Sequence, residues 1–579
     1  MNVYKQTDRA FHVTMPTRWV AFGVVLLAAM TVSPPLHALT RIELAEEPTH
    51  TISPYLFGQF MERTAMRSSR AEFGPEAALI PGTSELQPGV VEELLKLHAP
   101  IIRFPGGSVV GRQYDWTVLI DNSPYREDPA RPEHHLFGLD EMMELCAELD
   151  AEPLVAVNFR AAVWDARPEE LPALPEELAA GLVAYCNLPV GSTLPEGMPD
   201  WPALRARNGH PDPYNIRYFQ IGNEWVQWLG ATDAVQEQLG KPPFGSDEAL
   251  VEHVITRLLD MVNAMKAVDP DIKIIIDAVM WEKAHEPWFD QLLADDRVKD
   301  IADFATVHLY RPWAVSSFEK NDTPIDGDNL TPEEIWYAVV GAPDIGAEGF
   351  SVMDDEAWTL ARKHGWPITL TEWNWNGWGV ERQGGTLWPR ALGVAGFLHA
   401  FLRESEHIHI ATQSMMLGDR WIINGVRVDS EREHDPFILP SGRMTGFYSQ
   451  YHGNRYLPVK VDDPPMTHQP VRMGSLKPVP HLALVDTVAT EDDQAVYVHL
   501  INRDKDQAHA VEIDPGTRTF ARSARLYQME GGRWNPQEEL FVSPGQYEET
   551  ESEIELTSGS FLLKLPTASV TILKLFKED

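Results

Sequence analysis

Short runs of β-branched and aromatic residues alternate with longer segments of helical periodicity from position 56 onward. The longer segments, such as 90–97, 139–146 and 358–365, carry apolar residues at spacings of three and four. The β-type runs number eight and occupy residues 56–62, 101–105, 154–159, 216–221, 272–279, 304–310, 368–371 and 407–413. Alternating strands and helices indicate parallel βα units, and eight such units close a barrel. The pattern therefore predicts an α/β chain built on a (β/α)8 TIM barrel. The rival fold, a doubly wound open sheet, gives no reason for the fourth and seventh runs to bring their ends together.

The pattern changes near residue 453, where helical periodicity stops. Segments such as 495–500 and 561–565 then alternate apolar and polar positions, which is typical of strands in a β-sandwich. We predict a barrel at 56–453 and a C-terminal β-sandwich at 454–579. The segment 39–55 holds one strand-like run at 41–44, a candidate to join the sandwich. Two Pro- and Gly-rich stretches, 160–214 and 312–350, are predicted to be long insertions on one face of the barrel.

The first 38 residues have the order of a signal peptide. Arg18 precedes an apolar run at 19–32, and a small residue, Ala38, follows two prolines. The run is shorter than the roughly 20 residues of a spanning helix. We expect cleavage near Ala38, a secreted or periplasmic protein, and no stable membrane insertion afterwards. An uncleaved anchor is the alternative, and Met15 is a second candidate for the start of the chain.

Charge and cysteine content exclude several classes of function. Of the 579 residues, 86 are acidic and 48 basic, and the net charge of −38 repels nucleic acid. The only cysteines, Cys146 and Cys186, are too few for a thiolate metal site. They are either buried small hydrophobic residues or a disulfide between two helices. Two histidine pairs, at 134–135 and at 407 and 409, have no carboxylate at the spacing of metal ligands. We therefore expect no metal and no cofactor.

Two glutamates at the ends of β-type runs, Glu224 and Glu372, carry the candidate chemistry. The carboxyl ends of barrel strands share one face, where active sites are built. Hydrolysis of a glycosidic bond with retention needs one carboxylic acid and one carboxylate about 5 Å apart. Asn223 precedes the first glutamate and is a candidate ligand for a sugar 2-hydroxyl. Trp373 follows the second glutamate and forms a group with Trp375, Trp378 and Trp388. Their indole faces could stack on sugar rings, or the side chains could pack in the core.

Five motifs, in this order, resemble those of a known family. They are 58–62 (GQFME), 103–107 (RFPGG), 222–224 (GNE), 308–310 (HLY) and 371–374 (TEWN). With them the chain resembles the clan A retaining glycoside hydrolases, and within that clan the family 51 α-L-arabinofuranosidases, from Gly58 into the C-terminal sandwich. The resemblance implies that Glu224 is the general acid/base and Glu372 the nucleophile. It implies no metal.

The resemblance also implies a set of substrate-binding residues. These are Glu62, Asn223, His308, Tyr310 and Gln413; Ser108, in the loop after 103–107, and Trp373, from the tryptophan group, complete the candidate set. Two positions depart from the family pattern: Ser108 stands where Asn is usual, and Arg63 stands where His is usual after Glu62. We expect the contact with the furanose to differ from the family's at Ser108, and the floor of the site to differ at Arg63.

The sequence therefore predicts a secreted enzyme that releases α-L-arabinofuranosyl or related furanosyl residues from a polysaccharide or oligosaccharide by double displacement. Two alternatives stay open. One keeps the mechanism and changes the substrate to a β-xyloside, a β-glucan or another furanoside. The other is a barrel that binds carbohydrate without catalysis. Members of the family are often oligomeric, so a homo-oligomer is possible on the same ground.

Overall fold

A computed structural model gives the fold of the chain. It describes residues 39–578 apart from 64–73, 108–109, 111–114, 123–135, 165–172, 228–232, 235–236, 238–242, 281–282, 314, 316, 342–355, 376–386, 420–422, 475, 532–546 and 557–558. The predicted signal peptide, 1–38, lies outside the described residues.

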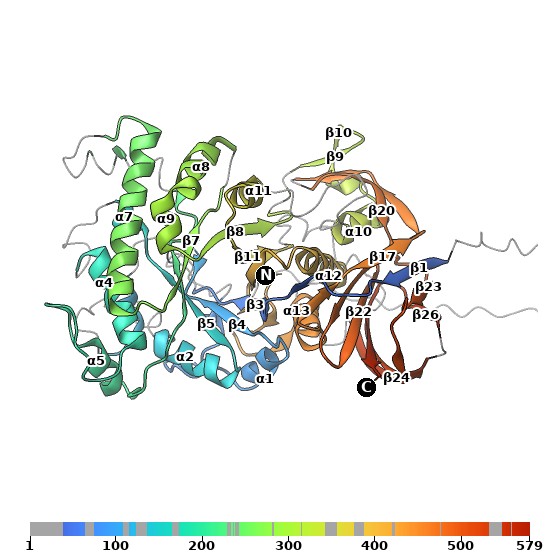
Figure 1. Cartoon of the computed structure of the whole chain (residues 1–579), viewed down its shortest axis with the longest axis horizontal. Coiled ribbons are helices and arrows are strands. Elements are labelled where there is room, and N and C mark those ends of the chain that lie inside the picture. The colour runs from blue at the N-terminus through green and yellow to red at the C-terminus, as the bar shows by residue number, and fades with distance from the viewer. Residues whose placement is uncertain are drawn as a thin grey trace, which may run out of the picture. The chain divides into compact units, whose positions relative to one another are not determined.

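Eight parallel strands close into a barrel, in the order β11-β12-β3-β4-β5-β6-β7-β8 (Figure 1). The strands are β3 (Tyr55–Phe60), β4 (Ile101–Phe104), β5 (Glu152–Val157), β6 (Tyr218–Ile221), β7 (Lys273–Asp277), β8 (Phe304–Tyr310), β11 (Ile368–Asn374) and β12 (Ile408–Ser414). Each corresponds to one predicted run, and β8 has the predicted bounds. The predicted fold class is confirmed.

The barrel interior is apolar at one end and polar at the other. Near the starts of their strands, the side chains of Ile101, Leu154, Tyr218, Ile275 and Ile410 form one buried cluster. Successive side chains of a strand point to opposite faces, so the residue two positions later faces the interior again. Two positions after four of these residues the chain has Arg103, Gln220, Asp277 and Thr412, which are all buried. Sequence alternation thus places a polar layer above an apolar plug, on the side where the strands end.

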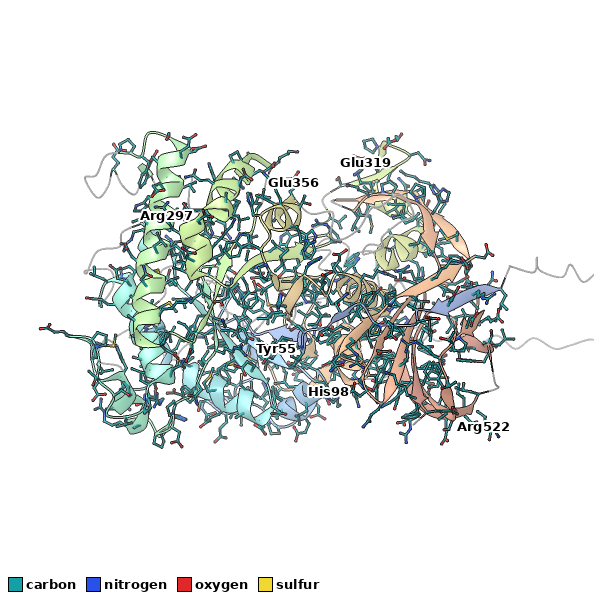
Figure 2. All side chains as sticks on the ribbon, in the orientation of Figure 1. Tyr55, His98, Arg297, Glu319, Glu356 and Arg522 are labelled. Carbon is teal, nitrogen blue, oxygen red and sulfur yellow. The ribbon has the colours of Figure 1, made fainter. Side chains whose placement is uncertain are left out.

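Helices surround the barrel. They are α1 (Val90–Leu95), α2 (Leu139–Glu148), α3 (Arg160–Val163), α4 (Pro175–Asn187), α5 (Trp201–Arg207), α7 (Asp247–Val268), α8 (Glu286–Ala294), α9 (Asp296–Ile301), α10 (Pro332–Val340), α11 (Glu356–Lys363), α12 (Leu387–Arg403) and α13 (Pro440–Gln450), with short 3-10 turns at η1 (Pro75–Ala77), η3 (Trp116–Leu119), η5 (Lys283–His285) and η6 (Gly327–Asn329). Tyr55 lies among the barrel strands in Figure 2, whereas Arg297 projects from the outer helices. Of the helices formed by described residues, none combines the length and apolar character that crossing a membrane requires.

We predicted that the stretch 160–214 is one long insertion, and this prediction is wrong. The stretch contains α4, which packs on α7 in the helix layer and buries most of its residues. Cys186 of α4 and Cys146 of α2 are buried free thiols, so the disulfide alternative does not form. Burial raises the pKa of both thiols, which makes them poor nucleophiles.

The C-terminal strands form two facing sheets. A seven-stranded sheet has the order β2-β16-β21-β22-β27-β24-β25, and a four-stranded sheet has the order β17-β1-β23-β26. The strands of these two sheets are β1 (Thr40–Leu44), β2 (His50–Thr51), β16 (Arg455–Leu457), β17 (Val459–Asp462), β21 (Val485–Glu491), β22 (Ala495–Asn502), β23 (His509–Asp514), β24 (Phe520–Gly531), β25 (Tyr547–Glu555), β26 (Phe561–Leu565) and β27 (Ser569–Lys577). In Figure 1, β1 lies beside β23 and β26, which come from the other end of the chain.

Smaller sheets complete the fold. They are β10-β9-β19, β13-β14-β15 and β18-β20, formed by β9 (Phe318–Lys320), β10 (Thr323–Ile325), β13 (Leu417–Gly418), β14 (Val426–Arg427), β15 (Phe437–Ile438), β18 (Met466–Gln469), β19 (Val471–Met473) and β20 (Val479–Ala483). The pairing of β9 with β19 ties the stretch after β8 to the C-terminal region.

The central strand β22 is buried on both faces. Val496, Val498 and Leu500 face the four-stranded sheet and form part of the sandwich core. The alternate residues Tyr497 and Ile501 belong to the larger core that the sheet shares with the barrel helices. This double burial explains why the segment is apolar at almost every position. The edge strand β25 is by contrast acidic and exposed, which discourages pairing with a further strand.

A buried ionic network joins the barrel to the sandwich. Asp486 of β21 accepts hydrogen bonds from Arg403 and His399 of α12, and its Oδ2 lies 3.3 Å from Arg503 Nη2. His399 also lies 2.8 Å from the Tyr448 hydroxyl of α13. Arg503 and His399 are fully buried, and Asp486 is nearly so. Buried charges are tolerated when they are paired, so this network fixes the two parts against each other.

Candidate active site

A β-bulge in β11 places Glu372 at the carboxyl end of the barrel. The pairing registers of β11 with both neighbours shift in this stretch, between Leu370 and Trp373 on one side and between Thr369 and Glu372 on the other. A bulge adds a residue to one strand and changes the direction of the side chains after it. As a result Thr371 and Glu372, although adjacent, both contact interior groups of the barrel.

Two side chains from neighbouring strands hold the Glu372 carboxylate. Arg103 of β4 donates through Nη1 to Glu372 Oε1 at 3.0 Å, and Tyr310 of β8 donates through its hydroxyl to Oε2 at 2.9 Å. Arg103 also donates to Gln220 Oε1 at 2.7 Å and to Asn223 Oδ1 at 2.6 Å, so its position is fixed. The guanidinium is fully buried, and Glu372 is 8% exposed. These two donors fix the orientation of the Glu372 carboxylate.

Glu224 follows β6 and reaches the same space. Its backbone φ is 48°, a left-handed conformation that few residues other than glycine adopt. This turn directs the carboxylate toward β8, where Glu224 Oε1 lies 2.9 Å from His308 Nδ1. Gln227 donates to the other oxygen at 2.6 Å. The side chain is 20% exposed, so water and ligands can reach it.

His308 lies between the two glutamates. Its Nδ1 is 3.6 Å from Glu372 Oε2, and one oxygen of each carboxylate lies within 4.8 Å of the other. This separation fits retaining glycosidases, in which the carboxyl groups are about 5 to 5.5 Å apart, and not inverting ones, which need about 6.5 to 9.5 Å. The two glutamates therefore lie as close together as the sequence analysis required of a retaining pair.

A chain of hydroxyl groups determines which His308 nitrogen carries a proton. The hydroxyl of Thr306 donates to the Thr369 carbonyl oxygen at 3.1 Å, so the Thr371 hydroxyl donates to Thr306 Oγ1. Thr371 Oγ1 is then left to accept from His308 Nε2–H at 3.1 Å. His308 Nδ1 and Glu224 Oε1 therefore share a single proton. Either the imidazole nitrogen or the carboxyl oxygen carries it.

Electrostatics favour a charged His308. Burial lowers the pKa of this imidazole, but Glu372 and Glu224 outweigh burial and hold the pKa above its ordinary value. Burial together with Glu372 raises the pKa of Tyr310 well above its ordinary value, so the phenol stays a donor. Glu224, His308 and Glu372 are close enough to ligate a cation. The Arg103 guanidinium and the raised His308 pKa both oppose a cation there.

Glu62 and Asn223 are both buried, just after the carboxyl ends of β3 and β6. Glu62 follows β3 and is 4% exposed, and Asn223 is 2% exposed. The Glu62 carboxylate packs against Gly107, where a Cβ atom would come within 2.1 Å of Glu62 Oε1. With its φ of +61°, Gly107 is therefore the residue that lets the loop approach Glu62. Ser108, the other predicted ligand in this loop, lies outside the described residues.

The role predicted for Trp373 is wrong. Its ring is fully buried and packs on Phe397 and Phe401 of α12, on the side of β11 away from the barrel interior. Trp375 and Trp388 are also core residues, while Trp378 lies outside the described residues. The bulge is the reason, because it directs Glu372 inward and Trp373 into the helix layer.

Gln413 does not face the substrate site either. Its amide oxygen accepts from Thr445 of α13 at 2.7 Å and from Gln59 at 3.2 Å, so the side chain points to the helix layer. The next residue of β12, Ser414, takes the interior position instead, with Oγ 2.8 Å from the Tyr310 hydroxyl. The predicted contact between Gln413 and the substrate is therefore wrong.

Sequence reasoning missed three polar residues of the site, Arg103, Ser414 and Asp277. Arg103 belongs to the motif 103–107. An arginine in a buried strand needs a carboxylate partner, and this could have identified it from the sequence. Asp277 is the last residue of β7, within the fifth predicted run, and is 2% exposed. Its carboxylate accepts from the backbone N–H of Trp225 at 3.1 Å and of Val279 at 2.9 Å, and its carbonyl accepts from Trp225 Nε1 at 2.8 Å. Asp277 thus holds the turn that carries Glu224.

Asp277 gives a prediction about pH and stability. Burial raises its pKa to about 6, so ionisation costs the folded state more than the unfolded one. The stability of the wild type relative to Asp277→Asn is therefore expected to fall between about pH 4 and pH 6. The change is on the order of 3 kcal/mol, at 1.36 kcal/mol per pKa unit. Denaturant unfolding of both proteins at several pH values measures it, and a constant difference contradicts it.

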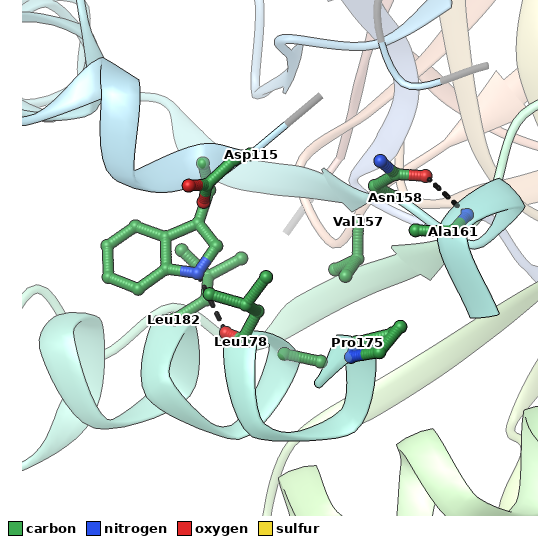
Figure 3. A pocket seen from close by; sticks show the side chains of 9 residues that line it. Asp115, Val157, Asn158, Ala161, Pro175, Leu178 and Leu182 are labelled. Carbon is green, nitrogen blue, oxygen red and sulfur yellow. Dashed lines mark hydrogen bonds between the residues drawn. The ribbon is translucent and has the colours of Figure 1, made fainter. Parts of the chain in front are cut away.

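A small cavity lies at the end of β5, between η3 and α4 (Figure 3). It has a volume of about 20 Å³ and is lined by Asp115, Trp116, Val157, Asn158, Ala161, Pro175, Leu178, Ala179 and Leu182. Two hydrogen bonds join residues of its lining, from Trp116 Nε1 to the Leu178 carbonyl oxygen and from the Ala161 N–H to Asn158 Oδ1. It has room for about one water molecule, so it is not a sugar site.

Comparison with known proteins gives consistent results. The family model of the alpha-L-arabinofuranosidase 1 domain matches residues 93–321, which include Glu224 and His308. The probable alpha-L-arabinofuranosidase C of Aspergillus niger is 25% identical over 494 residues, which cover 80% of this chain and 84% of that protein.

Solved structures share the fold. The alpha-L-arabinofuranosidase of Thermotoga maritima, in complex with arabinose, matches with a TM-score of 0.65 at 20% identity, over 93% of this chain and 100% of that one. The thermostable family 51 alpha-L-arabinofuranosidase of Thermotoga petrophila matches with a TM-score of 0.64 at 20% identity, over 92% and 99%. The predicted resemblance is confirmed, and this chain is a glycoside hydrolase similar to the family 51 α-L-arabinofuranosidases.

Proposed function

We propose that the chain releases α-L-arabinofuranosyl residues from oligosaccharides or polysaccharides with retention of configuration, with Glu372 as nucleophile and Glu224 as acid/base. The observation that carries this proposal is the distance of at most 4.8 Å between oxygens of the two carboxylates. Such a gap holds an anomeric carbon and leaves no room for an attacking water below it.

Glycosylation is the first step. The Glu372 carboxylate, oriented by Arg103 and Tyr310, attacks the anomeric carbon as the bond to the leaving oxygen breaks. Glu224 gives its proton to that oxygen, and the sugar becomes an ester of Glu372. His308 Nδ1, which carries the shared proton in the resting site, passes it to Glu224 Oε1, and the carboxyl gives it to the leaving oxygen.

Hydrolysis of the ester is the second step. Glu224, now a carboxylate, takes a proton from water, and the hydroxide equivalent attacks the anomeric carbon from the side that the leaving group has vacated. The bond to Glu372 breaks, and the sugar leaves with the configuration it had in the substrate. Asn223, held by Arg103, is placed to bind a sugar hydroxyl during both steps.

Replacement of Glu224 by alanine tests these roles. Loss of the general acid is expected to lower turnover of oligosaccharides by about 10²- to 10⁴-fold. The loss should be smaller for dinitrophenyl glycosides, because their leaving groups need no proton. Added azide should restore turnover and give a glycosyl azide, since a small anion fits the space left by the carboxylate. NMR of the first product checks retention, and an inverted product would refute the mechanism.

We further propose that the protein is exported. The support is the order of residues at its N-terminus: Arg18, an apolar run at 19–32, and Ala38 after two prolines. N-terminal sequencing of the mature protein from the medium or periplasm, after expression of the full chain, should find a start just after Ala38. An intact N-terminus inside the cell would contradict export.

A further inference from the structure

Ser414 is a hydroxyl residue of the barrel interior to which the mechanism above gives no role. It is the last residue of β12, and its side chain is fully buried. Its Oγ lies 2.8 Å from the Tyr310 hydroxyl oxygen, which is the one hydrogen-bond partner of this side chain among the described residues. Tyr310 also holds the nucleophile, since it donates to Glu372 Oε2 at 2.9 Å. Ser414 is therefore one residue removed from the reacting carboxylate.

Backbone contacts fix the position of Ser414. It pairs with Phe60 of β3 in the barrel sheet. Its carbonyl oxygen accepts a hydrogen bond from the side-chain amide of Asn374. Asn374 is the last residue of β11, two positions after Glu372. The strand that carries the nucleophile thus also holds Ser414 in place beside Tyr310.

The number of available protons decides which hydroxyl donates. Tyr310 has one hydroxyl proton and two neighbours, Glu372 Oε2 and Ser414 Oγ. A carboxylate that attacks an anomeric carbon has no proton to donate, so the phenol proton goes to Glu372. The Tyr310 oxygen then accepts from the Ser414 hydroxyl. The hydrogen bonds run in one direction, from Ser414 through Tyr310 to Glu372.

A donor on the phenol oxygen strengthens the hydrogen bond that the phenol gives. Hydrogen bonds in a chain polarise one another, so the contact with Ser414 makes the Tyr310 proton a better donor to Glu372. Burial and Glu372 raise the pKa of Tyr310, and the contact with Ser414 acts against them. This is the direction expected of a donor that stabilises negative charge on the phenol oxygen. Ser414 therefore acts on the carboxylate through Tyr310.

We propose that Ser414 is a positioning residue that speeds hydrolysis of the glycosyl ester and not its formation. This proposal rests on the function proposed above. In hydrolysis, water forms the new bond to the anomeric carbon and gives a proton to Glu224, and the electron pair of the breaking bond returns to Glu372. A stronger hydrogen bond to Oε2 stabilises this returning charge. In ester formation the same charge is lost, so the stronger bond gives no help there.

A slow reagent that labels the nucleophile separates the two steps. Dinitrophenyl 2-deoxy-2-fluoro-α-L-arabinofuranoside has a good leaving group, and its fluorine slows both steps, so the ester accumulates. The rate of inactivation measures ester formation, and the return of activity after removal of the reagent measures hydrolysis. Ser414→Ala should leave the inactivation rate within about twofold and slow the return of activity about fivefold, the scale of one strengthened hydrogen bond. In a Tyr310→Phe background, which lacks the connecting hydroxyl, Ser414→Ala should change neither rate further.

Ser405→Ala is the matched control. Ser405 is also buried, at 3% exposure, but it precedes β12, whose other end carries Ser414, and its hydroxyl donates to the Leu402 carbonyl oxygen at 2.7 Å. This variant should keep both rates. For Ser414→Ala, equal losses in both steps would overturn the proposal, because a merely structural defect lowers both. Unchanged rates, or a further loss in the Tyr310→Phe background, would overturn it too. If mass spectrometry of the treated wild type finds no sugar on Glu372, the proposed function itself falls.

Discussion

Replacing Glu372 by glutamine is expected to lower kcat/KM by at least about 10⁴-fold on every glycoside, including those with good leaving groups. The amide has nearly the shape of the carboxylate, but it cannot attack the anomeric carbon. Unlike Glu224→Ala, this variant should show no return of retaining turnover with azide. Steady-state kinetics on a dinitrophenyl furanoside measure the loss.

The matched control is Glu356→Gln on α11. Glu356 is exposed and its Oε1 lies 3.8 Å from Lys283, so this change should leave kinetics unaltered (Figure 2). Circular dichroism and thermal unfolding must show that Glu372→Gln is folded, because its partner Arg103 is fully buried. Near-normal turnover by a folded Glu372→Gln protein would remove Glu372 from the mechanism.

The second large effect is on stability, at the network between barrel and sandwich. Replacing Asp486 by asparagine is expected to destabilise the protein by about 3 to 5 kcal/mol, because it leaves Arg503 and Arg403 without their shared anion. The midpoint of denaturant unfolding at pH 7 measures the loss. The control is Asp290→Asn: this carboxylate is 42% exposed and pairs with Lys363 at the surface, so less than about 1 kcal/mol is expected. Equal midpoints for wild type and Asp486→Asn would contradict the role of the network.

The same network predicts how the stability difference between the wild type and Asp486→Asn changes as the pH falls. Burial favours the neutral form of Asp486, but Arg403, His399 and Arg503 outweigh it and hold its pKa well below the ordinary value. A carboxylate with a lowered pKa in the folded state stabilises that state above the unfolded pKa, near 4. This stabilisation is lost as pH falls through the folded pKa, so the gap between wild type and Asp486→Asn should narrow in acid.

The sequence by itself was sufficient for the fold and for the placement of Glu224 and Glu372 at one end of the barrel. Eight apolar runs separated by helical periodicity admit few arrangements other than a closed barrel, and the bounds of β8 follow from composition alone. Alternation within a strand also placed His308 and Tyr310 on one face, and both reach Glu372. These features are local, so the spacing of residue types along the chain determines them.

Only the tertiary structure decided which neighbours of the catalytic pair face the site. The bulge in β11 breaks the alternation, so Trp373 lies under α12 although it is adjacent to Glu372. The direction of Gln413 depends on α13, which supplies Thr445 as its partner. Arg103 and Asp277 act through contacts more than 50 residues away along the chain. A register shift and a distant hydrogen bond depend on how whole strands and helices pack, and no short stretch of sequence contains that information.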